Sequence, residues 1–327
     1  MLAFVLRRLF QAALVMLAVA FVAFSLFNYV GDPVNLMLGQ DATPEQKKEL
    51  RESLGLDQPD YVQFAVFVKN AVKGEFGLSL KQGRLVSTLI KERLPATLEL
   101  ALVAGGLALI GGLLMGVYTA LRRDSWLSQF LLTVSLIGVS LPNFLIGILL
   151  ILVFAVTLQW LPSYGRGDVT AIGWWTTGFL TTGGLRALVL PAVTLSLFPM
   201  TLIMRLVRSE MLEVLRTDYI KFARARGLTN RAVHFGHALK NTLVPVMTIT
   251  GLQLGSIIAF AIVTETVFQW PGMGFLFIQS VQFADIPVMA AYLVLISFVF
   301  VSINLIVDLL YYVVDPRLRF ERAAGAH

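Results

Sequence analysis

The sequence contains no cysteine, only three histidines and few charged side chains, which make up 14% of its 327 residues. Without cysteine there is no disulfide framework, no thiolate ligand for a metal ion and no cysteine nucleophile. Residues of the set AVILMFWYC make up 57% of the chain, and the mean hydropathy is +0.77. A soluble domain carries roughly 25% charged residues, so this composition effectively excludes a soluble globular enzyme. The surplus apolar surface must face lipid.

Long apolar runs, in contrast, are abundant. A membrane span requires about 20 predominantly apolar residues, and we expect six spans, at residues 9–29, 97–120, 128–158, 187–207, 243–265 and 287–314. Pro142 is expected to kink the third span. Pro191 and Pro199 lie within the fourth, where neighbouring helices can satisfy the freed backbone groups. The first run is too long for a cleavable signal and no small-residue cleavage pattern follows it.

The basic residues orient the chain. A net charge of +6 and a pI near 9.6 would indicate nucleic acid for a soluble protein, but here Lys and Arg flank the spans, so we expect membrane lipid and no nucleic acid as partner. Outside the long loop at residues 30–96, most Lys and Arg fall on one side, whereas the short loops opposite hold only Arg166 and Arg186. The positive-inside rule then places both termini in the cytoplasm.

The long external loop is expected to be structured. Thr43, Pro44 and Gln46 have the spacing of a capping box, with Gly55 closing the helix. A second helix is predicted over residues 59–73, with an apolar stripe and a stop at Gly74. The stripe comprises Tyr61, Phe64, Val68, Ala71 and Val72. It fits either the membrane surface or the helix bundle, and packing on the protein is the simpler expectation.

Several kinds of chemistry are missing. No glycine-rich loop ends in Gly-Lys-Ser or Gly-Lys-Thr, so any nucleotide hydrolysis must come from a partner. His234 and His237 have no thiolate or carboxylate nearby in the sequence to complete a metal site, and their expected place is the headgroup region. Every histidine lies outside the spans, so a Ser/His/Asp arrangement cannot form within the membrane. We therefore expect no catalytic residue and no metal site.

Three acidic residues lie in or near spans, where burying a charge is expensive. Glu99 and Glu265 lie near the outer ends, where water or loop donors can reach them. A structural role is favoured for both. Asp308, with Asn304 one turn earlier, is expected to tie the last span to a neighbouring helix rather than to relay protons.

The fifth span carries hydroxyl and amide side chains at Thr248, Thr250, Gln253, Ser256 and Thr264. They fit an aqueous path and hydrogen bonding between helices equally well. The candidate pathway residues are Thr248, Gln253, Ser256, Thr264 and Glu265.

The loop at residues 208–242 is too long for a simple connection. Thr217 or Asp218 can cap a short helix that ends before Gly227, and Thr229 or Asn230 can cap a second helix toward Lys240. Tyr219, Phe222, Ala223 and Ala225 give the first helix an apolar knob among basic residues. Such a helix suits either an anionic lipid surface or a groove on another protein.

This loop resembles the coupling loop of binding-protein-dependent ABC importer permeases, closest to the dipeptide, oligopeptide, glutathione and nickel group. The resemblance rests on Asp218-Tyr219-Ile220-Lys221-Phe222-Ala223-Arg224-Ala225-Arg226-Gly227-Leu228 and on His237-Ala238-Leu239-Lys240-Asn241-Thr242-Leu243-Val244-Pro245. Further strings look like family landmarks in family order: Gly31-Asp32-Pro33, Leu54-Gly55-Leu56-Asp57, Gly77-Leu78-Ser79, Arg93-Leu94-Pro95-Ala96-Thr97-Leu98-Glu99, Ser140-Leu141-Pro142, Glu265-Thr266-Val267-Phe268, Trp270-Pro271-Gly272-Met273-Gly274 and Asp315-Pro316-Arg317.

The resemblance implies an all-α type I importer permease with six transmembrane helices. Residues 1–96 would form the first helix and the external loop, residues 97–315 a five-helix core with the coupling loop, and residues 316–327 a cytoplasmic tail. The residues that would contact an ATPase are Asp218, Tyr219, Phe222, Ala223, Ala225, Gly227 and Leu228.

The resemblance also implies partners. This chain looks like the first permease subunit of a heterodimer in the cell (inner) membrane. Two cytoplasmic ATPases would bind ATP and Mg, and a periplasmic or extracellular binding protein would deliver the substrate. Phe222 departs from the family pattern, which usually has threonine there.

Short peptides are the expected substrate, with glutathione, a nickel chelate or an opine as alternatives. A self-sufficient secondary carrier would also fit six spans, but inverted repeats and a cluster of intramembrane acids are both missing.

Overall fold

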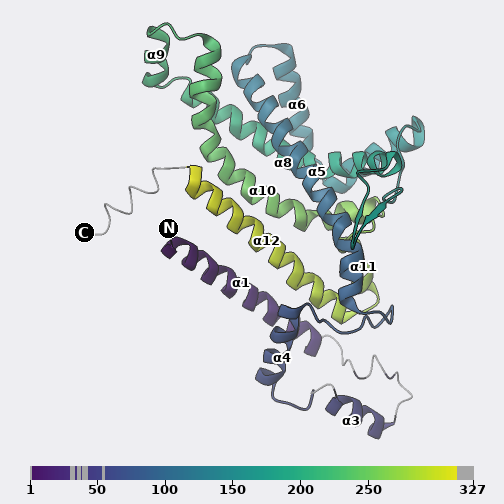
Figure 1. The fold of residues 1–327 in the computed structure, drawn as a ribbon. Coiled ribbons are helices and arrows are strands. Elements are labelled where there is room, and N and C mark those ends of the chain that lie inside the picture. Colours follow the sequence, from purple (N-terminus) through teal and green to yellow (C-terminus); the bar gives the residue numbers. More distant parts are fainter. Residues whose placement is uncertain (1, 30–33, 35–37, 39–42, 54–55, 315–327) are drawn as a thin grey trace.

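The computed structural model describes residues 2–29, 34, 38, 43–53 and 56–314, most of which are helical (Figure 1). The longer helices are α1 (Leu2–Tyr29), α5 (Val86–Leu121), α6 (Trp126–Ser140), α8 (Thr182–Val214), α10 (Leu239–Val267) and α12 (Ile286–Val314). The shorter ones are α3 (Pro44–Ser53), α4 (Asp60–Lys73), α7 (Asn143–Leu150), η1 (Ile151–Thr157), α9 (Asp218–Ala225), η2 (Ala232–Ala238) and α11 (Met273–Gln282). The strands β1 (Thr170–Ile172) and β2 (Trp175–Thr177) form an antiparallel hairpin with Ala171 opposite Thr176.

Five of the described helices are long and apolar enough to cross a membrane: α1, α5, α8, α10 and α12. The third predicted span, at residues 128–158, is instead a pair of helices, α6 and α7 with η1, bent by 114° at the break between them. Leu141 is extended at φ −93° and ψ 138° directly before Pro142, as steric clash with the proline ring requires. The break falls where the sequence predicts it, but the expectation of one kinked span is corrected to a broken helix.

The centre of the bundle is the pair α5 and α8, which lie along each other, with α10 packed against both. Gly112 and Gly116 of α5 face α8, and a Cβ atom on Gly116 would lie 2.6 Å from the Cβ of Val207. Small residues four positions apart allow this close approach. Pro191 and Pro199 are buried within α8, which continues through both.

Two sequence boundaries lie inside helices. The predicted division between residues 96 and 97 falls within α5, and α8 extends past the predicted fourth span to Val214. Gly31-Asp32-Pro33, Gly55, Asp315-Pro316-Arg317 and the predicted tail at residues 316–327 lie outside the described residues.

The capping box of α3 is confirmed. The backbone N–H of Thr43 donates to Oε1 of Gln46 at 3.0 Å, and the N–H of Gln46 donates to Oγ1 of Thr43 at 3.3 Å. The helix over residues 59–73 is also confirmed as α4, and Gly74 ends it at φ 75°.

Of the two expected positions for α4, the membrane surface and the helix bundle, the structure shows packing on the bundle. The ring of Phe64 lies edge-on to those of Phe21 and Phe24 in α1, with centroids 5.9 and 5.5 Å apart. Tyr61 and Val72 of the predicted stripe remain exposed, so only part of it is buried against α1.

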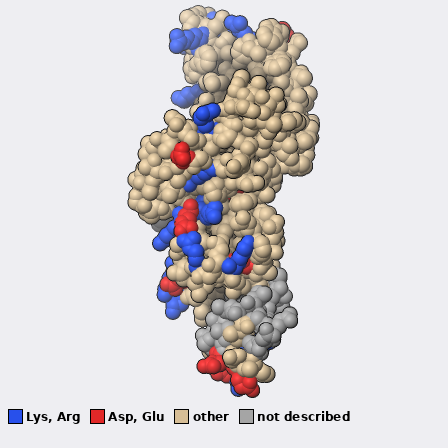
Figure 2. Space-filling model, turned by 90° about the vertical axis from the view of Figure 1, so that its right-hand side faces the viewer, with Lys and Arg blue, Asp and Glu red and all other residues tan. Residues whose placement is uncertain are grey.

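The bundle has two distinct ends. In Figure 1 the N-terminus of α1 and the helix α9 lie toward one end, whereas α4, α11 and the start of α12 lie toward the other. Basic side chains outnumber acidic ones at the upper end of Figure 2, which is the end of α9.

Candidate coupling surface and the opposite end of the bundle

The segment after α8 forms one short helix, α9. Gly227 follows it with φ 79°, a backbone conformation that favours glycine. The prediction of a second separate short helix toward Lys240 is wrong, because η2 runs directly into α10. The chain between Gly236 and Pro245 has no glycine or proline that would end the helix. The predicted cap is present, since the N–H of Ala232 donates to Oγ1 of Thr229 at 3.3 Å.

One face of α9 is anchored in the protein. Ile220 and Ala223 are buried in an apolar cluster with Ala120, Met211, Val233 and Ala238. Ala223 therefore lies in the core beneath α9 rather than on the exposed knob in which the sequence places it.

The other face of α9 is open. Phe222 is 64% exposed, and Tyr219 and Leu228 are about two-fifths exposed. Asp218, Ala225 and Gly227 are exposed as well. Six of the seven predicted coupling residues thus share a free surface, which is backed by a packed core.

The two histidines near α9 differ in setting. Burial first, and then the positive charge of Arg224, lower the pKa of His234 below its usual value of 6.5. His237 is exposed. No group of three potential metal ligands occurs among the described residues.

At the opposite end, Glu265 joins α10 to α5 and α11. Its fully buried carboxylate accepts hydrogen bonds from Oγ1 of Thr97 at 2.6 Å and from the N–H of Phe275 at 2.9 Å. The indole of Trp270 donates to the carbonyl of Ala96 at 3.0 Å. A Cβ atom on Gly272 would overlap the carboxylate. Two strings far apart in the sequence, around residues 96–99 and 265–274, therefore form one structural unit.

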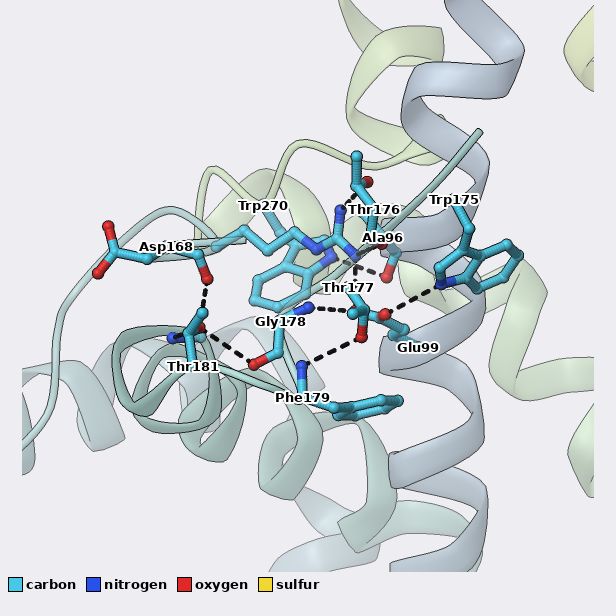
Figure 3. A network of polar contacts seen from close by, with 12 residues as sticks. Ala96, Glu99, Asp168, Trp175, Thr176, Thr177, Gly178, Phe179, Thr181 and Trp270 are labelled. Carbon is cyan, nitrogen blue, oxygen red and sulfur yellow. Dashed lines mark hydrogen bonds and ion pairs between the residues drawn. The ribbon is translucent and has the colours of Figure 1, made fainter. Parts of the chain in front are cut away.

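Glu99 holds the hairpin against α5 (Figure 3). Its carboxylate accepts Nη2 of Arg166 at 2.6 Å, the indole N–H of Trp175 at 3.3 Å and the N–H of Gly178 at 3.3 Å. Arg166 also donates to the carbonyl of Thr176 at 2.6 Å. Loop donors reach Glu99, as expected, whereas the donors to Glu265 belong to α5 and α11. The sequence does not predict the buried partner Arg166.

The predicted pathway residues separate into two groups. Thr264 and Glu265 are buried within this chain, whereas Gln253 and Ser256 are half-buried. The hydroxyl of Ser256 donates to the carbonyl of Gln253 at 2.8 Å. The side chain of Thr248 lies outside the described part of the chain.

Two further carboxylates tie elements together. Asp308 accepts Nη2 of Arg8 at 3.0 Å and so links α12 to α1, which confirms its predicted tie to a neighbouring helix. Asp285, missed as a site residue, is buried and accepts Oγ of Ser79 at 2.5 Å and the N–H of Leu80 at 3.1 Å. It directly precedes α12 in the sequence.

Comparison with known proteins gives matches over nearly the whole chain. Residues 112–320 match the family described as "Binding-protein-dependent transport system inner membrane component", and residues 1–101 match its N-terminal companion. A dipeptide transport system permease protein of Alkalihalophilus pseudofirmus is 36% identical over 98% of this chain and 100% of its own length. A di/tripeptide transport system permease protein of Pseudomonas aeruginosa is 40% identical with the same coverage. A glutathione transport system permease protein of Escherichia coli is 36% identical, again over 98% and 100%.

The fold also has a solved counterpart. A chain in inward-facing conformations of the MetNI methionine ABC transporter matches with a TM-score of 0.54 and 20% identity, over 69% of this chain and 96% of that one. At this identity the likeness concerns the fold, which is that of a type I ABC importer permease. Together these matches show that the chain belongs to the binding-protein-dependent transport system inner membrane components, a family of multi-pass permeases.

Proposed function

We propose that this chain and a second permease subunit form the pathway by which an ABC importer takes up short peptides. Two partner ATPases bind ATP and Mg and hydrolyse the nucleotide, and a binding protein delivers the peptide at the end opposite α9. The end-to-end similarity to di- and tripeptide permeases supports the substrate class. The glutathione permease, itself named for a small peptide, is 36% identical over the same shares of the two chains.

The observation that carries the proposal is the divided character of α9. Tyr219, Phe222 and Leu228 are exposed, whereas Ile220 and Ala223 are buried in the bundle. A short helix with an apolar outer face fits a groove on another protein. Its buried face ties it to the bundle, so a movement imposed by the ATPases would pass to the spans and open the pathway to alternate sides.

The pathway itself is proposed to run along the uncovered face of α10. Gln253 and Ser256 are half-buried there, and Phe260 and Val263 are exposed on the same side of the helix. The second permease subunit would cover this face. Thr264 and Glu265 are buried within this subunit, and we propose a structural role for both.

The test is coupled transport by the reconstituted complex. Phe222→Ala removes the most exposed aromatic side chain of α9, so we expect peptide uptake and peptide-stimulated ATP hydrolysis to fall together. Phe130→Ala removes an exposed phenylalanine of α6 instead, and should leave both unchanged. Full uptake with the Phe222 variant would contradict the role of α9. Gradient-driven uptake by this chain alone in liposomes would contradict the importer assignment.

A further inference from the structure

A pocket of about 560 Å³ opens at the α9 end of the bundle, between the α5–α6 connection, the end of α8 and α9. Arg122 and Arg123 line it from the connection, Arg216 from the segment after α8, and Arg224 from α9. Leu212 and Leu215 add an apolar wall. None of these residues takes part in the exposed surface proposed to meet the ATPase.

The pocket has a large excess of positive charge. Among the described residues that line it, Asp124 alone is acidic, and it pairs with its neighbour Arg123 at 3.4 Å. Within the described residues no carboxylate lies within ion-pair distance of Arg122, Arg216 or Arg224. Three guanidinium groups therefore line one cavity, although such like charges repel each other.

The pocket lies beside the end of a span and an exposed tryptophan. Trp126, 76% exposed, begins α6 directly after the lining residue Ser125, and its ring lies 6.5 Å from that of the exposed Phe130. Exposed tryptophan at the end of a span is typical of the membrane interface. The apolar span α5 ends at Leu121, immediately before the lining arginines.

We propose that this pocket binds the phosphate of an anionic phospholipid headgroup. Arginine donates pairs of hydrogen bonds to phosphate oxygens, and basic pockets between spans suit such headgroups. A lipid fits better than a soluble anion because the cavity combines arginines with an apolar wall beside Trp126. Since Arg224 belongs to α9, a bound lipid would also hold the coupling helix in place; this consequence rests on the proposed function.

The experiment is native mass spectrometry of the purified full chain with phosphatidylglycerol or phosphatidylcholine added at equal concentration. The wild type should retain phosphatidylglycerol preferentially. Each arginine near an anionic surface contributes about fivefold in affinity, so the triple variant Arg122→Gln, Arg216→Gln, Arg224→Gln should lose on the order of 100-fold. Arg231→Gln removes an exposed charge at the same end but outside the pocket, and should change retention little.

The outcomes of this experiment distinguish a lipid site from the alternatives. Equal retention of the two lipids, or unchanged retention by the triple variant, would overturn the proposal. If inorganic phosphate at millimolar concentration binds and displaces the lipid, the pocket is a site for a soluble anion and the lipid proposal is wrong. If the triple variant elutes as aggregate, the single variant Arg216→Gln should still lose roughly fivefold. The readout requires no transport, so a failure of the coupling assay would leave this result standing.

Discussion

Three carboxylates near the spans are stabilised in different ways. Glu99 forms a buried ion pair with Arg166, and Asp308 pairs with Arg8 across two helices. Glu265 has no ion-pair partner among the described residues, and it accepts hydrogen bonds from the neutral hydroxyl of Thr97 and the backbone N–H of Phe275. A carboxylate with only neutral donors must keep its position relative to them. A Cβ atom at position 272 would displace the carboxylate, so glycine is required there.

Glu99 allows a direct test of the buried pair. In Glu99→Ala, Arg166 would stay buried without its counter-charge, so we expect the free energy of unfolding to fall by about 3–5 kcal/mol. Glu52→Ala disrupts the exposed pair of Lys48 and Glu52, 3.9 Å apart, and should cost less than about 1 kcal/mol. Thermal unfolding of the purified chain in detergent measures both. A similar loss for the two variants would contradict the assigned role of Arg166.

His234 gives a prediction about pH. Burial and Arg224 lower its pKa below 6.5 in the folded chain, so the unfolded chain binds the proton more readily. Its contribution to stability is therefore present above about pH 6.5 and is lost as the pH falls. Arg224→Gln should raise the pKa part of the way toward 6.5, whereas Arg226→Gln should leave it unchanged. NMR titration of ¹³C-labelled histidine measures the shift, and equal pKa values in the two variants would exclude the influence of Arg224.

At the scale of the elements, the packing of α5 on α8 depends on glycine at defined positions. Gly116→Ala would bring a methyl group against Val207 and the carbonyl of Met204, and overpacking of this kind costs about 1–3 kcal/mol. Gly106 lies in the same helix, and a Cβ atom added there would meet no neighbouring atom within 4 Å, so Gly106→Ala should be neutral or slightly stabilising. The unfolding midpoints of the two variants in detergent should therefore move apart. Equal midpoints would show that α5 and α8 can move apart enough to fit the methyl group without loss of stability.

The helices were predictable where local chemistry determines them. The capping box of Thr43 and Gln46, the stop at Gly74 and the glycine after α9 act within a few residues of each other, and the structure has all three. The partner of Glu99 lies 67 residues away, and no local pattern connects them. The 114° bend at Pro142 is likewise beyond local rules, because a proline breaks a helix but the surrounding helices set the angle.

At the scale of the whole molecule, orientation is the open prediction. The absence of cysteine makes single introduced thiols specific reporters. Phe222→Cys, on the exposed face of α9, should react with a membrane-impermeant maleimide only from the cytoplasmic side. Trp174→Cys, in the exposed turn of the hairpin, should react only from the opposite side. Labelling of both from one side of sealed membrane vesicles would refute the predicted orientation.

The small cluster beneath α9 has a mechanical consequence. Ala120 comes from α5, Met211 from α8, and Val233 and Ala238 from η2, which continues into α10. A force applied to α9 is therefore shared among the ends of three spans at once. None of these three spans can move separately without opening the cluster, so their ends would move together as one rigid unit.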